Sequence, residues 1–103
     1  MQCRVAVVQY RVKQFDHKKN FRTIERYIAK AAKKNADIIV FPEDAVEGWI
    51  KDRPDLVDYQ HAHRAQFQKL AKQYKIAIVP GSIMEGDAKG IYNTTYFIDS
   101  DGS

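Results

Sequence analysis

The sequence has only one cysteine and no long apolar run. Cys3 has no second cysteine to pair with, so a fold held together by intramolecular disulfides is excluded. No apolar stretch approaches the roughly 20 residues that a membrane-spanning helix needs. The first residues also lack the pattern of a secretory leader, a charged segment followed by an apolar one. We therefore expect a protein of the reducing cytoplasm.

Glycine- and serine-rich linkers, internal repeats and low-complexity tracts are also missing, so no domain boundary is indicated. Val, Ile, Leu and Phe make up about a quarter of the chain, enough apolar material for collapse into a core. We expect residues 1–103 to belong to one domain.

The chain has a formal net charge of +4, but the distribution of this charge argues against a nucleic-acid-binding protein. The basic residues lie mostly in 13–34 and 64–75, at the spacing of exposed helix faces. Zinc-ligand spacing and aromatic RNA-binding motifs are also lacking. We expect no nucleic-acid partner.

Hydrophobic patterning predicts an α/β fold in the order β-α-β-α-β-β-β. Three short apolar runs read as buried parallel strands covered on both sides, at 5–8, 38–41 and 76–79. A helix after Asp16, its predicted N-cap, should end near Asn35 in a left-handed conformation, and a second helix should run from about Asp55 to Tyr74. Strands connected by helical crossovers indicate a parallel sheet.

Residues 83–85 and 92–99 read as two further strands around a turn at 86–90, and Asp101-Gly102 is a hairpin signal. A hairpin turn at the end of the chain needs a second arm, which the sequence does not include. One strand edge and one apolar face of the sheet would then have no partner. We expect the chain to be the front portion of a larger domain.

Glu43 is the first polar side chain after the second predicted strand, which Pro42 ends because proline has no N–H for the ladder. Ligands of parallel sheets bind beyond the carboxyl ends of the strands, so Glu43 should point into a crevice. We expect Phe41 and Trp49 to desolvate its carboxylate partly, which would favour a general base near pH 7. The alternative is a carboxylate that caps a helix or faces water.

Several segments together resemble the nitrilase, or carbon–nitrogen hydrolase, superfamily. Any one of them is a weak signal, but the ordered set spans nearly the whole chain. The segments are 5–9 (VAVVQ), 36–43 (ADIIVFPE), 79–82 (VPGS) and 92–94 (YNT). The resemblance implies a four-layer αββα sandwich, of which this chain is the N-terminal part.

The resemblance also implies a catalytic set of Glu, Lys and Cys that cleaves non-peptide C–N bonds of a small amide, carbamoyl or nitrile compound. Only the Glu position is present, at Glu43, so the chain alone should be inactive. The family uses neither metal nor organic cofactor, and commonly forms homo-oligomers. Trp49 occupies a place where the family often has an aromatic residue near the substrate, although simple core packing is an equal alternative.

Other candidates are weaker. Cys3 should lie at the end of the sheet opposite the crevice, where we expect a small core residue and not a nucleophile. His61 and His63 lie two apart on a predicted helix and should diverge, which argues against a shared metal. Glu43, Asp44 and Glu47 form an acidic loop that would suit Mg²⁺ in a phosphoesterase, but no phosphate-binding glycine loop accompanies them.

A different class of function also fits the pattern. The acidic loop 43–47 and an open sheet edge would suit a non-catalytic α/β module that binds a partner. A truncated enzyme should expose apolar sheet and self-associate, whereas such a module should be a monomer with a cooperative melt.

Overall fold

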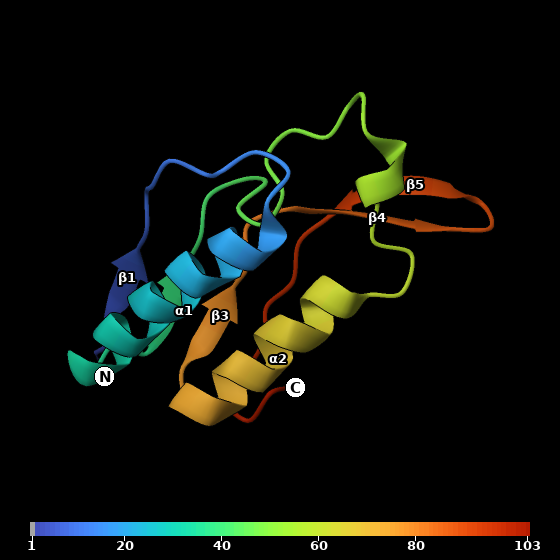
Figure 1. Ribbon diagram of the computed structural model, residues 1–103. Helices are drawn as coiled ribbons and strands as arrows, with labels where there is room; N and C mark the ends of the chain where they lie inside the picture. Colours follow the sequence, from blue (N-terminus) through green and yellow to red (C-terminus); the bar gives the residue numbers. More distant parts are fainter. Residues whose placement is uncertain (1) are drawn as a thin grey trace.

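The computed structural model describes residues 2–103 and has the predicted element order, with one added turn of 3₁₀ helix (Figure 1). The elements are β1 (Val5–Val7), α1 (His17–Lys33), β2 (Ile38–Val40), η1 (Pro54–Leu56), α2 (Ala62–Tyr74), β3 (Ala77–Val79), β4 (Ile83–Asp87) and β5 (Gly90–Thr94). The mixed α/β class expected from the sequence is confirmed.

Strands β1, β2 and β3 form a parallel sheet in that order, as predicted. Ile39 in the central strand is paired with Ala6 on one side and Ile78 on the other. Ile98 then adds an antiparallel bridge to Ile78, with N–H···O distances of 2.8 and 2.9 Å. The segment after the hairpin therefore returns to the free side of β3.

Helix α1 begins and ends as its sequence predicts. The Asp16 carboxylate accepts a hydrogen bond from the Lys19 N–H at 3.1 Å, which satisfies one of the free donors of the first turn. Asn35 adopts the left-handed conformation, with φ 62°. Ile24 and Ile28 on the inner face of the helix are fully buried.

Helix α2 begins at Ala62, so the prediction of a helix from about Asp55 is wrong at this end. Pro54 starts only a short 3₁₀ turn, and Val57 is extended. Asp58 then donates its N–H to the Met84 carbonyl at 2.9 Å and accepts hydrogen bonds from the N–H groups of Ala62 and His63. The pairing with β4 keeps this segment extended, and the Asp58 carboxylate satisfies the first free N–H groups of α2.

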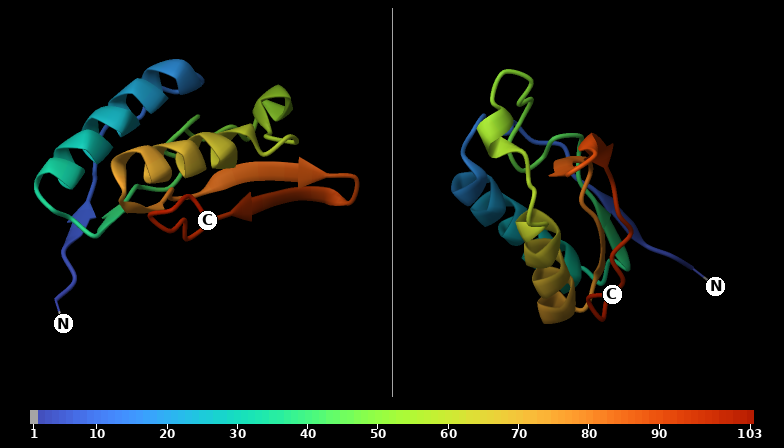
Figure 2. Two further views of the ribbon diagram at one scale, coloured as in Figure 1. Left: turned by 90° about the horizontal axis from the view of Figure 1, so that it is seen from below. Right: turned by 90° about the vertical axis from the view of Figure 1, so that its right-hand side faces the viewer.

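Both helices pack on the same face of the parallel sheet, where the core lies (Figure 2). The opposite face, which we call the outer face, is open. Val5 and Val7 are 49% and 78% exposed, and Phe97 beside β3 is 58% exposed. The prediction that the first strand is covered on both sides is therefore wrong, because β1 is an edge strand with helices on one side only.

Strands β4 and β5 form an antiparallel hairpin that projects away from the helices (Figures 1 and 2). Its turn is held by Asp87, whose Oδ1 accepts hydrogen bonds from the N–H groups of Lys89 and Gly90. β5 ends at Thr94, earlier than the predicted 92–99 strand. The predicted turn at 101–102 is present, with Gly102 at φ 90° donating its N–H to the Asp99 carbonyl.

No helix within residues 2–103 is long and apolar enough to cross a membrane.

Candidate active site

The candidate site lies at the carboxyl edge of the parallel sheet, where loop 41–50 after β2 meets loop 80–82 after β3. Phe41 donates the last ladder hydrogen bond of its strand, to the Val79 carbonyl at 3.0 Å. Pro42 follows and has no N–H to continue the ladder. The chain then turns at 43–47, so Glu43 stands at the start of this turn, on the edge of the sheet that the sequence predicts.

The Glu43 side chain is exposed, so the prediction of partial desolvation is wrong within this chain. Phe41 is buried among the core residues against the helices, and Trp49 is 58% exposed. Neither covers the Glu43 carboxylate. Within residues 2–103, no hydrogen bond or ion pair holds that carboxylate, so its direction depends on the backbone of the loop.

The other end of the loop is fixed by its backbone. The Trp49 carbonyl accepts a hydrogen bond from the Gln14 side chain at 3.0 Å, and the Glu47 carbonyl accepts one from the Phe15 N–H at 2.8 Å. The Trp49 ring is 58% exposed and is not part of the core of residues 2–103. Its exposure on the same loop as Glu43 leaves the ring available as a wall of a binding pocket.

Asn20 on α1 anchors the same loop from beneath. This buried amide donates to the carbonyl groups of Lys13 and Val46 at 2.7 and 2.6 Å, and accepts from the Lys13 N–H at 2.8 Å. Buried backbone groups need hydrogen-bond partners, and this one side chain supplies them to backbone groups in two segments of the chain. The loop is therefore held to α1 by side-chain contacts that sequence periodicity does not show.

Asp44, next to Glu43, makes the contact between the two loops. Its backbone is left-handed, with φ 55°, and its N–H donates to the Ser82 hydroxyl oxygen at 3.0 Å. The Ser82 hydroxyl is also 3.4 Å from Oδ1 of Asp44. Partial burial and the negative charge of Glu43 raise the pKa of Asp44, while the hydrogen bond from Ser82 lowers it. The net shift is upward.

This raised pKa gives a pH-dependent prediction. As pH rises above the ordinary Asp value, the unfolded chain loses the Asp44 proton before the folded chain does, so folding stability falls. Asp44→Asn removes this titration and still tolerates a left-handed backbone. The free energy of unfolding of the variant minus that of the original chain should therefore be larger at pH 7 than at pH 3, as measured by urea unfolding at both values. A relative stability that is equal at both pH values would contradict the assignment.

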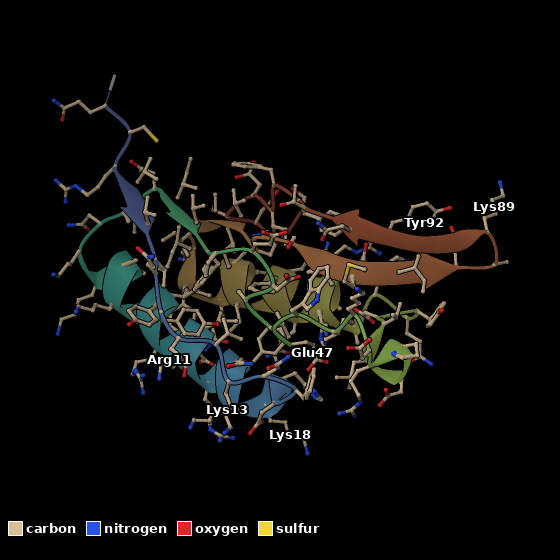
Figure 3. All side chains as sticks on the ribbon, turned by 90° about the horizontal axis from the view of Figure 1, so that it is seen from above. Arg11, Lys13, Lys18, Glu47, Lys89 and Tyr92 are labelled. Atoms are coloured by element: carbon tan, nitrogen blue, oxygen red, sulfur yellow. The ribbon has the colours of Figure 1, made fainter. Side chains whose placement is uncertain are left out.

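Glu47, four residues after Glu43, is buried between the two helices. Lys13 and Lys18, by contrast, lie at the surface near the start of α1 (Figure 3). Oε2 of Glu47 is 3.3 Å from Nε2 of His63 and 3.6 Å from Nδ1 of His17. Its Oε1 is buried and has no hydrogen-bond partner. Sequence reasoning missed this cluster because its three members come from α1, the loop and α2.

His61 and His63 do diverge, as the sequence predicts. His61 contacts the buried Glu85 at 2.9 Å, whereas His63 contacts Glu47. His61 is not on the helix, however: it precedes α2 in a left-handed conformation, with φ 56°. The prediction of two helical histidines is corrected in this respect.

The acidic loop does not gather its carboxylates. Glu43 is exposed, Asp44 contacts Ser82, and Glu47 contacts the histidines. No group of three His, Cys, Asp or Glu side chains in residues 2–103 is arranged to hold a metal ion. This geometry gives the magnesium hypothesis no support.

Cys3 precedes β1, whereas Glu43 follows β2. Because the two strands are parallel, the two side chains lie at opposite ends of the sheet, as predicted. Cys3 is exposed, so the prediction of a small core residue is wrong. The cysteine lies outside the strand pairing, which begins at Val5.

Comparison with known families adds evidence that is independent of this geometry. Residues 4–103 match the carbon–nitrogen hydrolase family. This chain belongs to that family. A curated relative, the probable hydrolase YhcX of Bacillus subtilis (strain 168), is 28% identical over 110 residues, covering 97% of this chain and 21% of that protein.

Solved structures agree on the fold of this carbon–nitrogen hydrolase chain. The NitN amidase of Nesterenkonia sp. AN1 superposes with a TM-score of 0.85 at 21% identity, covering 98% of this chain and 41% of that one. The carbon–nitrogen hydrolase of Helicobacter pylori G27 has a TM-score of 0.85 at 24% identity, covering 98% of this chain and 37% of that one. The chain thus spans about two-fifths of these structures.

Proposed function

We propose that the whole protein is a hydrolase that cleaves non-peptide C–N bonds in a small amide, carbamoyl or nitrile compound, with Glu43 as general base. The supporting observation is the position of Glu43, directly after a proline-ended strand at the carboxyl edge of the sheet, in a chain that belongs to the carbon–nitrogen hydrolase family. Trp49, exposed on the same loop, is the proposed wall of the substrate pocket.

For an amide, Glu43 accepts the proton of a cysteine thiol, and the thiolate attacks the carbonyl carbon. The C–N bond then breaks as Glu43 passes this proton to the nitrogen, which leaves as ammonia, and a thioester remains. Water adds to the thioester carbon while Glu43 accepts a proton, and the products are the carboxylic acid and the free thiol. A lysine stabilises the oxyanion formed in both steps.

The Lys and Cys of this set lie outside the 103 residues, so the chain alone is proposed to be inactive. Cys3 does not supply the thiol, because it lies at the other end of the sheet. The substrate is a small molecule, and the set needs neither metal nor organic cofactor. The unpaired thiol of Cys3 favours a cytoplasmic location.

We further propose that residues 1–103 form the N-terminal part of one αββα domain. The support is the open outer face, where Val5, Val7 and Phe97 are exposed, and the coverage of only 41% of the amidase chain. A second sheet packed on this face would bury these side chains, and a homo-oligomer is proposed for the whole protein. Isolated residues 1–103 should then self-associate in analytical ultracentrifugation.

The alternative function, a non-catalytic binding module, draws on the same open face. It predicts that residues 1–103 are a monomer with a cooperative thermal melt. Sedimentation at several concentrations distinguishes the binding module from the incomplete enzyme domain, because self-association through an exposed sheet rises with concentration.

The proposed function is tested by Glu43→Gln in the whole protein. Ammonia release from a panel of small amides, carbamoyl compounds and nitriles should fall by about 100-fold or more in kcat/KM, because glutamine cannot accept the proton. Asp52→Asn, an exposed acid in the same connection between β2 and α2, is the matched control and should stay near the original rate. A Glu43→Gln enzyme within a few-fold of the original would disprove the assignment.

A further inference from the structure

Within residues 2–103, the Glu43 side chain is exposed and no hydrogen bond or ion pair holds its carboxylate, so the direction in which it leaves the chain depends on the backbone that precedes and follows it. On the preceding side, Pro42 restricts the chain. On the following side, Asp44 turns the chain with φ 55°, a conformation that aspartate adopts only at some cost. Something must hold this turn.

The Ser82 hydroxyl is the side-chain group that contacts this turn at Asp44, beside the hydrogen bonds from the Gly48 N–H to the Asp44 carbonyl and from the Tyr10 hydroxyl to the Ala45 carbonyl. The Ser82 hydroxyl accepts the Asp44 N–H at 3.0 Å and lies 3.4 Å from Oδ1 of the same residue. One side chain from the loop after β3 thus contacts both the backbone and the side chain of the residue that follows Glu43. Asn20 and Gln14 hold the same loop only from Val46 onward.

Ser82 is itself held close to the Glu43 loop by its neighbour. Gly81 has φ 82°, and a Cβ atom there would lie 2.0 Å from the Pro42 carbonyl oxygen. The two loops therefore touch backbone to backbone immediately before the Ser82 to Asp44 contact. This close approach restricts the position of the Ser82 backbone, and therefore of its hydroxyl, relative to β2 and β3.

We propose that Ser82 is a positioning residue for Glu43: its hydroxyl holds the left-handed turn at Asp44 and so fixes the direction in which Glu43 presents its carboxylate. The effect of Ser82 on the direction of Glu43 is inferred from the geometry of this chain, whereas its effect on catalysis rests on the proposed function. Ser82 does not touch the reacting atoms.

The first test uses the whole protein and two variants of nearly equal shape, Ser82→Thr and Ser82→Val, of which only the first retains a hydroxyl. Amide hydrogen exchange measured by NMR should be about fivefold or more faster at Asp44 in Ser82→Val than in Ser82→Thr, which corresponds to loss of one hydrogen bond. Exchange at Ile39 in the central strand should be the same in both. Equal exchange at Asp44 would overturn the proposal.

If a branched side chain at this position prevents folding, Ser82→Ala compared with the original chain gives the same test. Ser100→Ala is the matched control, since Ser100 is exposed and, within residues 2–103, its hydroxyl is hydrogen-bonded only to Asp99. It should leave exchange at Asp44 unchanged.

The second test uses the whole protein at a temperature where circular dichroism shows both variants fully folded. Ser82→Val should lower kcat about fivefold or more relative to Ser82→Thr and leave KM within twofold, because a misdirected base slows the chemical step and not substrate binding. If kcat is equal in the two variants while Glu43→Gln is inactive, the positioning role is wrong and the proposed function stands. If Glu43→Gln stays active, the proposed function is wrong, and the exchange experiment alone decides whether Ser82 holds the turn.

Discussion

Replacing Gly81 by alanine is expected to destabilise the chain by more than about 3 kcal/mol. Two effects add. The left-handed φ of 82° disfavours any side chain, and the new Cβ would lie 2.0 Å from the Pro42 carbonyl oxygen and 2.8 Å from its carbon. These are backbone atoms of a strand end, so they cannot move without separating the loops of the candidate site. Urea denaturation followed by circular dichroism measures the loss.

Gly48→Ala is the matched control, because Gly48 has a similar φ of 76° but a different neighbour. Its new Cβ would meet the Gln14 side chain at 3.3 Å, and such a side chain can shift. We expect a loss of about 1–2 kcal/mol, the cost of the left-handed conformation alone. If Gly81→Ala cost no more than Gly48→Ala, the close contact between the two loops would be disproved.

The second large effect is expected for Phe67→Ala in the core. Phe67 on α2 is fully buried, and its ring lies 5.1 Å from that of Phe21 on α1 and 6.2 Å from that of Phe41 after β2. Removing it leaves a cavity where both helices and the sheet meet, at a cost of about 3–5 kcal/mol. Since small domains have total stabilities of about 5–15 kcal/mol, this change should nearly unfold the chain.

Phe97→Ala provides the comparison, because Phe97 lies on the open outer face and is 58% exposed. Its removal should change the free energy of unfolding by less than about 0.5 kcal/mol in a monomeric sample. A comparable loss in both variants of the monomeric sample would mean that Phe97 is packed within the monomer, contrary to the structure.

Element order and the ends of α1 could be predicted because they depend on local chemistry. The Asp16 side chain caps the helix that follows it, and Asn35 tolerates the left-handed conformation that ends it. Pro42 likewise ends its strand for a local reason, the missing N–H, and so placed Glu43 at the correct edge of the sheet.

The start of α2 could not be predicted, because a distant strand determines it. Local pattern favours helix from Asp55, but the Asp58 N–H pairs with the Met84 carbonyl, 26 positions later in the sequence. The contacts of Glu47 with His17 and His63 could not be predicted for the same reason, since they join three segments that are distant in the sequence.

The surroundings of Glu43 were mispredicted for a related reason. Sequence neighbours were expected to cover it, but Phe41 is buried against the helices and Trp49 is exposed. The prediction of burial for β1 assumed material on the outer side of the sheet as well. Residues 2–103 place both helices on the other side.

The most direct test of the central claim is the pH dependence of kcat/KM in the whole protein, before and after Glu43→Gln. If Glu43 is the general base, the original enzyme loses activity toward low pH, and the variant shows a low rate without this acidic limb. An acidic limb that persists unchanged in Glu43→Gln would assign the base to another residue and contradict the account.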